Sequence, residues 1–153
     1  MLATLQPPRG HRRRRLSRLL LGLLLGLALP VAATEVPIGG GFRIVYSAFN
    51  STFIQPEIAQ RYQLRRGRDA GLINIAVVDS ANRTHPALLS GRVSNIFQQQ
   101  QSLEFITIDE GDAIYYLAPF EIDGESFLSF TVTVDSAGQP VKSFNFKKRF
   151  YEQ

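Results

Sequence analysis

An antiparallel β-sheet is indicated most clearly by the stretch Phe127-Leu128-Ser129-Phe130-Thr131-Val132-Thr133-Val134. From Leu128 onward, large apolar side chains alternate with serine and threonine. Successive side chains of a strand point to opposite faces of its sheet, so this strand is predicted to have one buried and one exposed face. The turn pairs Asp123-Gly124 and Ala137-Gly138 lie on either side of it. Because the buried face needs a second packed layer, the stretch predicts a fold of two sheets.

Six other runs rich in β-branched and aromatic residues extend this pattern: 42–49, 72–78, 87–97, 103–108, 113–118 and 141–151. The second of them is apolar on both faces apart from one asparagine and is expected to be a central strand. In the third, Leu89, Val93 and Phe97 share one parity, and Gly91 suggests a bulge. Pro119 suggests an edge or a strand end. Turns at roughly 8–12-residue spacing predict an all-β fold, an antiparallel immunoglobulin-like β-sandwich of about seven strands.

One segment departs from the β pattern and predicts a short helix near residues 56–62. Pro56 suits the first helical position, and Glu57 places an acid in the first turn, where it interacts favourably with the helix dipole. Ile58 and Tyr62 are four residues apart and are expected to face the sandwich together. The segment 64–69 that follows is predicted to be a basic loop.

Residues 1–33 have the organisation of a secretory signal peptide. An arginine cluster precedes a leucine block at 19–29, and Val31-Ala32-Ala33 supplies the small residues of a cleavage site, placed after Ala33. A retained membrane anchor is the alternative, but the apolar run is shorter than the about twenty residues that a spanning helix needs. The predicted organisation is a cleaved signal peptide 1–33, a flexible segment 34–41 around Gly39-Gly40-Gly41, and a single β-sandwich domain 42–153.

The charge distribution argues against a nucleic-acid partner. The full chain carries a formal charge of +4, but six of its seventeen Lys and Arg residues and none of its thirteen acids precede residue 34. The rest of the chain is therefore slightly acidic, and its global charge does not favour DNA or RNA binding. The chain has no cysteine, so the domain is expected to be held by hydrophobic burial without disulfides.

No constellation of residues names a reaction, and the protein is predicted not to be an enzyme. His85 is the only histidine after residue 33, and it is expected to be a solvated loop residue and not the base of a triad. One histidine without cysteine does not make a zinc site, and the acidic turn 109–112 lacks the alternating ligands of a calcium loop. No metal or other cofactor is therefore expected. An enzyme of unrecognised type, using Glu104, Glu110 or Asp112 as a carboxylate pair, is the alternative.

The candidate binding residues lie in two loops. Rigid β-sandwiches present functional residues on their loops. The basic loop could bind a phosphate-bearing lipid head group or an acidic protein surface, although arginines that merely keep a loop soluble are the simpler alternative. The preceding loop, between the first strand and the helix, is expected near the same end, where Asn50 and Thr52 shape its turn. The candidates are Asn50, Ser51, Thr52, Arg65, Arg66 and Arg68.

Several motifs in order resemble a family of short exported proteobacterial proteins that is described only as a domain of unknown function. They are residues 46–53, 56–59, 72–75, 103–105, 110–116 and the closing Phe150-Tyr151. The resemblance implies a Gram-negative, periplasmic protein and supports the sandwich, but it brings no functional residues. The expected role is a non-enzymatic binding or accessory module for an unidentified periplasmic protein or anionic envelope component. Membrane contact is expected only through an uncleaved leader.

Overall fold

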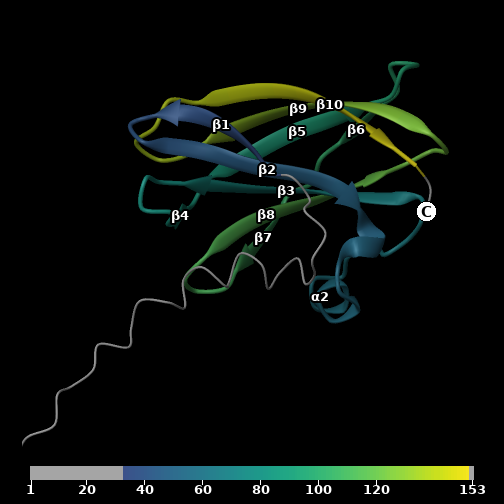
Figure 1. Cartoon of the computed structure of the whole chain (residues 1–153), viewed down its shortest axis with the longest axis horizontal. Helices are drawn as coiled ribbons and strands as arrows, with labels where there is room; N and C mark the ends of the chain where they lie inside the picture. Colours follow the sequence, from purple (N-terminus) through teal and green to yellow (C-terminus); the bar gives the residue numbers. More distant parts are fainter. Residues whose placement is uncertain (1–32, 152–153) are drawn as a thin grey trace, which may run out of the picture.

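The computed structural model describes residues 33–151, which form two antiparallel β-sheets and little helix (Figure 1). The first sheet has the order β1-β2-β3-β8-β7, with β4 paired to the end of β3; the second has the order β10-β9-β5-β6. The strands are β1 (Thr34–Gly39), β2 (Phe42–Asn50), β3 (Ala70–Val78), β4 (Thr84–His85), β5 (Leu88–Ser94), β6 (Gln100–Ser102), β7 (Ile106–Asp109), β8 (Ile114–Glu121), β9 (Ser126–Asp135) and β10 (Lys142–Phe150). A 3₁₀ helix, η1 (Ser51–Phe53), and an α-helix, α2 (Pro56–Arg61), follow β2. The all-β sandwich is confirmed.

The predicted signal peptide lies outside the described residues apart from Ala33. Within residues 33–151, no helix is long and apolar enough to cross a membrane.

The main core lies between the two sheets and follows the predicted alternation. In β9, the four apolar residues from Leu128 to Val134 are at most 3% exposed. They pack with apolar side chains of β2, β3 and β8 from the first sheet. Phe130 is at the centre of an aromatic group, with its ring stacked on Phe146 at 4.5 Å and edge-on to Phe120 at 5.1 Å. Burial of these rings compensates for the absence of disulfides.

A second apolar cluster covers the outer face of the first sheet, which explains why β3 is apolar on both faces. Leu72, Ile108 and Leu117 from this face pack with Ile54 and Ala59 of the segment that contains α2. Pro56 occupies the start of the helix, and Ile58 and Tyr62 pack against the cluster as predicted. Helix α2 thereby fixes the position of the residues on either side of it.

Gly71 of β3 is required by the close approach of an aromatic ring. A Cβ atom at this position would lie 2.2 Å from Cζ of Phe120, its partner on β8. The Phe120 ring is 3% exposed and contacts both Phe130 and Phe150. It therefore has little room to move aside.

The expectation of a flexible segment at 34–41 is wrong. Residues 34–39 form β1, which pairs with β2; of the three glycines 39–41, Gly39 ends β1, and Gly40 and Gly41 form the tight connection to β2. All three have positive φ, between 58° and 129°, which glycine adopts without strain. The edge strand β1 is mostly exposed, so it carries no strong burial pattern in the sequence.

The predicted strand 103–108 is shorter in the structure, because Pro119 lies on the neighbouring strand. The register that pairs Ile106 with Leu117 would place Glu104 opposite Pro119, which has no N–H to donate. Strand β7 accordingly begins at Ile106. Beyond this point the side-chain amide of Gln101 donates to the Glu121 carbonyl and accepts from the Glu121 N–H, in place of a strand. From Pro119 onward, β8 therefore has no strand on its β7 side, and the edge predicted at Pro119 is present.

The structure differs in two details from the strand predicted at 87–97. The pairing of β5 with β9 is regular through Gly91, so there is no bulge there. The glycine instead permits close approach, since a Cβ would lie 2.9 Å from the Thr131 carbonyl oxygen. Strand β5 ends at Ser94, so Phe97 is not a buried strand residue but part of a turn.

Candidate functional site

Several connecting segments meet at one end of the sandwich, drawn at the right of Figure 1. Pairing places the end of β5 beside the start of β9, and the start of β9 beside the end of β10. The Asn50 side-chain amide, at the end of β2, donates to the Tyr151 carbonyl oxygen over 2.8 Å, which joins the two sheets here. We call this end the arginine end: η1, the loop 62–69, the β8–β9 turn 122–125, the β5–β6 turn 95–99, and Tyr151.

Ser51 fastens the arginine-bearing loop to the sandwich. Its side chain is fully buried, and its Oγ donates to the Gly67 carbonyl over 3.2 Å and accepts from the Gly67 N–H over 2.9 Å. The neighbouring Thr52 carbonyl accepts a hydrogen bond from the Arg66 guanidinium over 2.8 Å. The two predicted groups of site residues, 50–52 and 65–68, are thus brought together. Asn50 and Ser51 are buried supports and Thr52 is half-buried, so the arginines are the exposed members of the predicted set.

The arginines of this end differ in how far their charges are compensated. Arg65 pairs with Asp69 at 2.7 Å, and the hydrogen bond from Arg65 is the main cause that lowers the pKa of Asp69. Arg61, which ends α2 outside this end, lies 3.9 Å from Glu110. Arg66 is exposed and bonds only a backbone carbonyl, and Arg68 is exposed with no ion pair or hydrogen bond to the described residues. Arg66 and Arg68 therefore present uncompensated positive charge.

A groove of about 540 Å³ opens beside the free edge of β8, next to this loop. Its lining includes Arg65 from the loop, Gln101 and Glu104 from the segment between β6 and β7, and Pro119 and Glu121 from β8. Glu110 lies at the far end of β7, where it accepts a hydrogen bond from the Tyr62 hydroxyl over 3.0 Å. The structure thus separates Glu104 from Glu110 along the length of β7. Among the described residues, no group of three or more His, Asp or Glu side chains could hold a metal ion.

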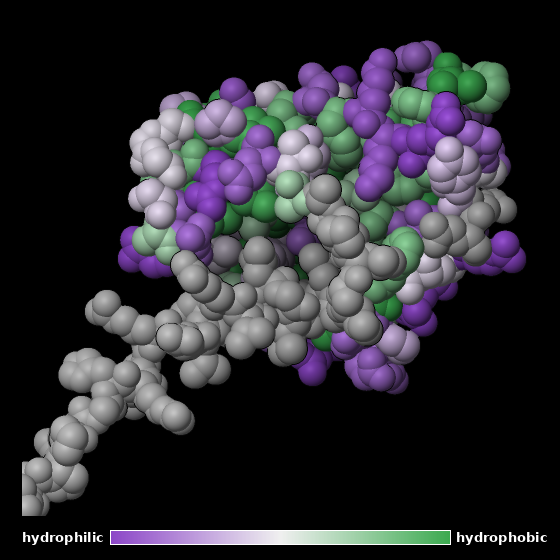
Figure 2. All heavy atoms as spheres, in the orientation of Figure 1, coloured by the Kyte–Doolittle hydropathy of each residue, from purple (hydrophilic) through white to green (hydrophobic). Residues whose placement is uncertain are grey.

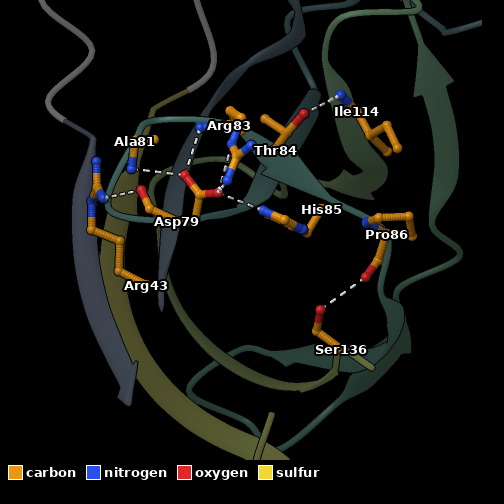
Figure 3. A network of polar contacts seen from close by, with 9 residues as sticks. All are labelled: Arg43, Asp79, Ala81, Arg83, Thr84, His85, Pro86, Ile114 and Ser136. Carbon is orange, nitrogen blue, oxygen red and sulfur yellow. Dashed lines mark hydrogen bonds and ion pairs between the residues drawn. The ribbon is translucent and has the colours of Figure 1, made fainter. Parts of the chain in front are cut away.

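A polar network at the opposite end of the sandwich was not foreseen from the sequence (Figure 3). The Asp79 carboxylate, 8% exposed, bonds His85 Nε2 and Arg83 Nε, each over 2.9 Å. It also accepts the N–H groups of Ala81 and Arg83. These hydrogen bonds, with that of His85 the largest cause and then those of Arg83, hold the pKa of Asp79 well below its usual range. The only sequence feature that could have indicated this network is the close spacing of Asp79, Arg83 and His85 around a turn.

His85 is therefore a structural residue and not the solvated loop histidine expected. Its ring is 4.9 Å from that of Phe42 and edge-on to it, and its nitrogen is bonded to Asp79. In Figure 3 the nearby hydroxyls serve the backbone: Thr84 accepts from the Ile114 N–H, and Ser136 donates to the Pro86 carbonyl. The network holds β4 against β3 and forms no nucleophile–base pair within the described residues.

Comparison with known proteins identifies one family and one fold. The family model described as "Domain of unknown function (DUF4426)" matches residues 38–153. A crystal structure of a DUF4426 family protein (PA0388) from Pseudomonas aeruginosa PAO1 is 30% identical, with a TM-score of 0.71, and the match covers 79% of this chain and 96% of that chain. A copper-bound variant of FetP from uropathogenic Escherichia coli strain F11 is 10% identical, with coverages of 80% and 97% and a TM-score of 0.52, and shows similarity of fold alone. None of the curated proteins matches.

Proposed function

Because the chain belongs to the DUF4426 family, a domain of unknown function, we propose a role from its own geometry. The protein is an exported, periplasmic, non-enzymatic binding module that contacts an anionic partner through the arginine end. The organisation of residues 1–33 supports export. The resemblance to an exported family, together with the Pseudomonas aeruginosa relative, supports a Gram-negative periplasm.

The observation that carries this proposal is the fixed loop backbone between two arginines, of which Arg66 is also held by the Thr52 carbonyl. Ser51 bonds both backbone groups of Gly67 and thereby holds the loop between Arg66 and Arg68 on the sandwich. A guanidinium held in place loses less conformational freedom when it binds, and it can donate two parallel hydrogen bonds to a phosphate or carboxylate. The loop is thus suited to recognise an anion without rearrangement.

The test is site-specific photo-cross-linking in intact cells. A cross-linking residue replaces Arg68 in one version of the chain and Leu88 in a control version. Leu88 is 76% exposed and begins β5 at the opposite end of the strands. We expect adducts from position 68 and none from position 88. With the cross-linker moved to position 53, we expect the double variant Arg66→Gln, Arg68→Gln to give fewer adducts than the same version with both arginines in place. Equal labelling from positions 68 and 88, or none from position 68, would contradict the proposal.

A further inference from the structure

The turn between β5 and β6 is a well-ordered projection at the arginine end. The Asn95 side-chain oxygen accepts the N–H groups of Phe97 and Gln99, each over 3.0 Å, and its amide donates to the Gln99 side chain. The backbone closes the turn through Asn95 N–H to the Gln99 carbonyl and Gln98 N–H to the Asn95 carbonyl. Because these bonds fix the backbone of the turn, its outward side chains project from the molecule in a fixed direction.

Those outward side chains are large and apolar. Ile96 is 69% exposed and Phe97 is 77% exposed. Figure 2 shows a hydrophobic patch at the upper right corner of the molecule, where the β5–β6 turn lies in Figure 1. No charged residue occurs between Arg92 and Glu104. The sandwich thus exposes an uncharged apolar tip, which is costly in water unless a partner covers it.

Other exposed apolar side chains gather at the same end. Phe53, Phe127 and Tyr151 are between 38% and 50% exposed. Of the seven exposed large apolar residues that residues 33–151 contain, only Leu88 and Val141 lie at the opposite end of the strands. The apolar surface is therefore concentrated where Arg66 and Arg68 stand.

The charges around these side chains include both signs. Arg149 lies over the Phe127 ring, 4.8 Å from its centroid, and 3.5 Å from Glu125. Glu121 and Asp123 are exposed near the β8–β9 turn, and Lys147 is exposed on β10. The net charge of the end is consequently small, so apolar contact must supply most of the affinity and the cations only a contribution.

We propose that the arginine end rests on a phospholipid bilayer surface, with Ile96 and Phe97 inserted at the boundary of the head groups and acyl chains. A convex, uncharged apolar tip, with exposed aromatic rings and arginines at the same end of the molecule, is the arrangement that interfacial proteins present to lipid. A protein partner would need a matching pocket, whereas a bilayer accommodates a convex tip of any shape. This inference rests on the proposed function and names the anionic envelope component as lipid. Two inserted side chains give weak, reversible binding.

The experiment is sedimentation of the exported protein, purified from cells with its N-terminus checked by mass spectrometry, with phospholipid vesicles. One set of vesicles contains phosphatidylcholine alone and the other adds phosphatidylglycerol. We expect binding to both, stronger with phosphatidylglycerol, and a loss of about tenfold or more in partition for the double variant Ile96→Ser, Phe97→Ser. The control Leu88→Ser removes a side chain that is 76% exposed at the opposite end and leaves partition unchanged.

Two further variants separate the contributions. Phe97→Trp gives a fluorophore whose emission shifts to shorter wavelength when vesicles are added, because the side chain enters an apolar environment. The double variant Arg66→Gln, Arg68→Gln lowers binding to phosphatidylglycerol vesicles and leaves binding to phosphatidylcholine unchanged. Failure of the wild-type protein to sediment with either vesicle, or an equal loss in Leu88→Ser, would overturn the lipid inference. Continued cross-linking from position 68 in that case would leave the proposed function standing with a protein partner.

Discussion

Ser51→Ala should release the arginine loop from the sandwich. The substitution removes two hydrogen bonds, to the carbonyl and from the N–H of Gly67, at a fully buried position. A neutral hydrogen bond contributes about 1 kcal/mol to folding, and leaving a partner unsatisfied costs about 1–3 kcal/mol. Since the loop can partly recover hydrogen bonds to water, we expect the free energy of unfolding to fall by about 2 kcal/mol in total.

Urea unfolding followed by circular dichroism measures this change. With a slope of about 1–3 kcal/mol per molar urea, a loss of about 2 kcal/mol lowers the midpoint by about 1 M. Hydrogen exchange should show loss of protection at the Gly67 amide, and cross-linking from position 68 should weaken. Thr52→Ala is the matched control, because Arg66 bonds the Thr52 carbonyl and not its side chain. An unchanged midpoint together with an unchanged Gly67 exchange rate would refute the role given to Ser51.

The remaining predictions concern the core and the polar network. Gly71→Ala should lower the free energy of unfolding by about 1–3 kcal/mol in a thermal melt, because the new methyl group overlaps the Phe120 ring; an unaltered melting temperature would show that the ring is free to shift. Asp79→Asn should lower the free energy of unfolding most near neutral pH, because the pKa of Asp79 in the folded protein is well below the ordinary aspartate pKa of about 3.9. The charged carboxylate therefore stabilises the fold fully above a pH of about 3.9, and this stabilisation is lost as the pH falls through the folded-state pKa. Urea midpoints of the variant and the wild type should therefore converge on acidification, and a constant difference would exclude this linkage.

The elements that could be predicted from the sequence are those whose pattern is local. The alternation of β9, the two apolar faces of β3 and Pro56 at the helix start each depend on near neighbours, and the structure has all three. The family resemblance to a domain of unknown function is also confirmed. Strand β1 was missed because an exposed edge strand has little pattern of its own, and the late start of β7 depends on Pro119, which only the register brings opposite Glu104.

Local sequence patterns could point to the two loops of the candidate site but not to the contact between them. Both loops were identified, but their connection through Ser51 and Gly67 is a tertiary contact, and it gives Ser51 a supporting role. Phe97 was expected on the same strand parity as buried residues, because Ala87 to Phe97 has the composition of one continuous strand. The turn that begins after Ser94 exposes it instead. The sequence suggested membrane contact only through an uncleaved leader, whereas the proposed contact through this turn rests on the structure.

The free edge of β8 affects whether the protein aggregates at high concentration. An open row of backbone N–H and C=O groups can recruit a strand from another molecule and start aggregation. Here Pro119 has no donor, and the Gln101 amide occupies both groups of Glu121. An incoming strand would therefore find no two consecutive donors and acceptors to copy. Replacing Pro119 and Gln101 together would turn this edge into a template for intermolecular pairing.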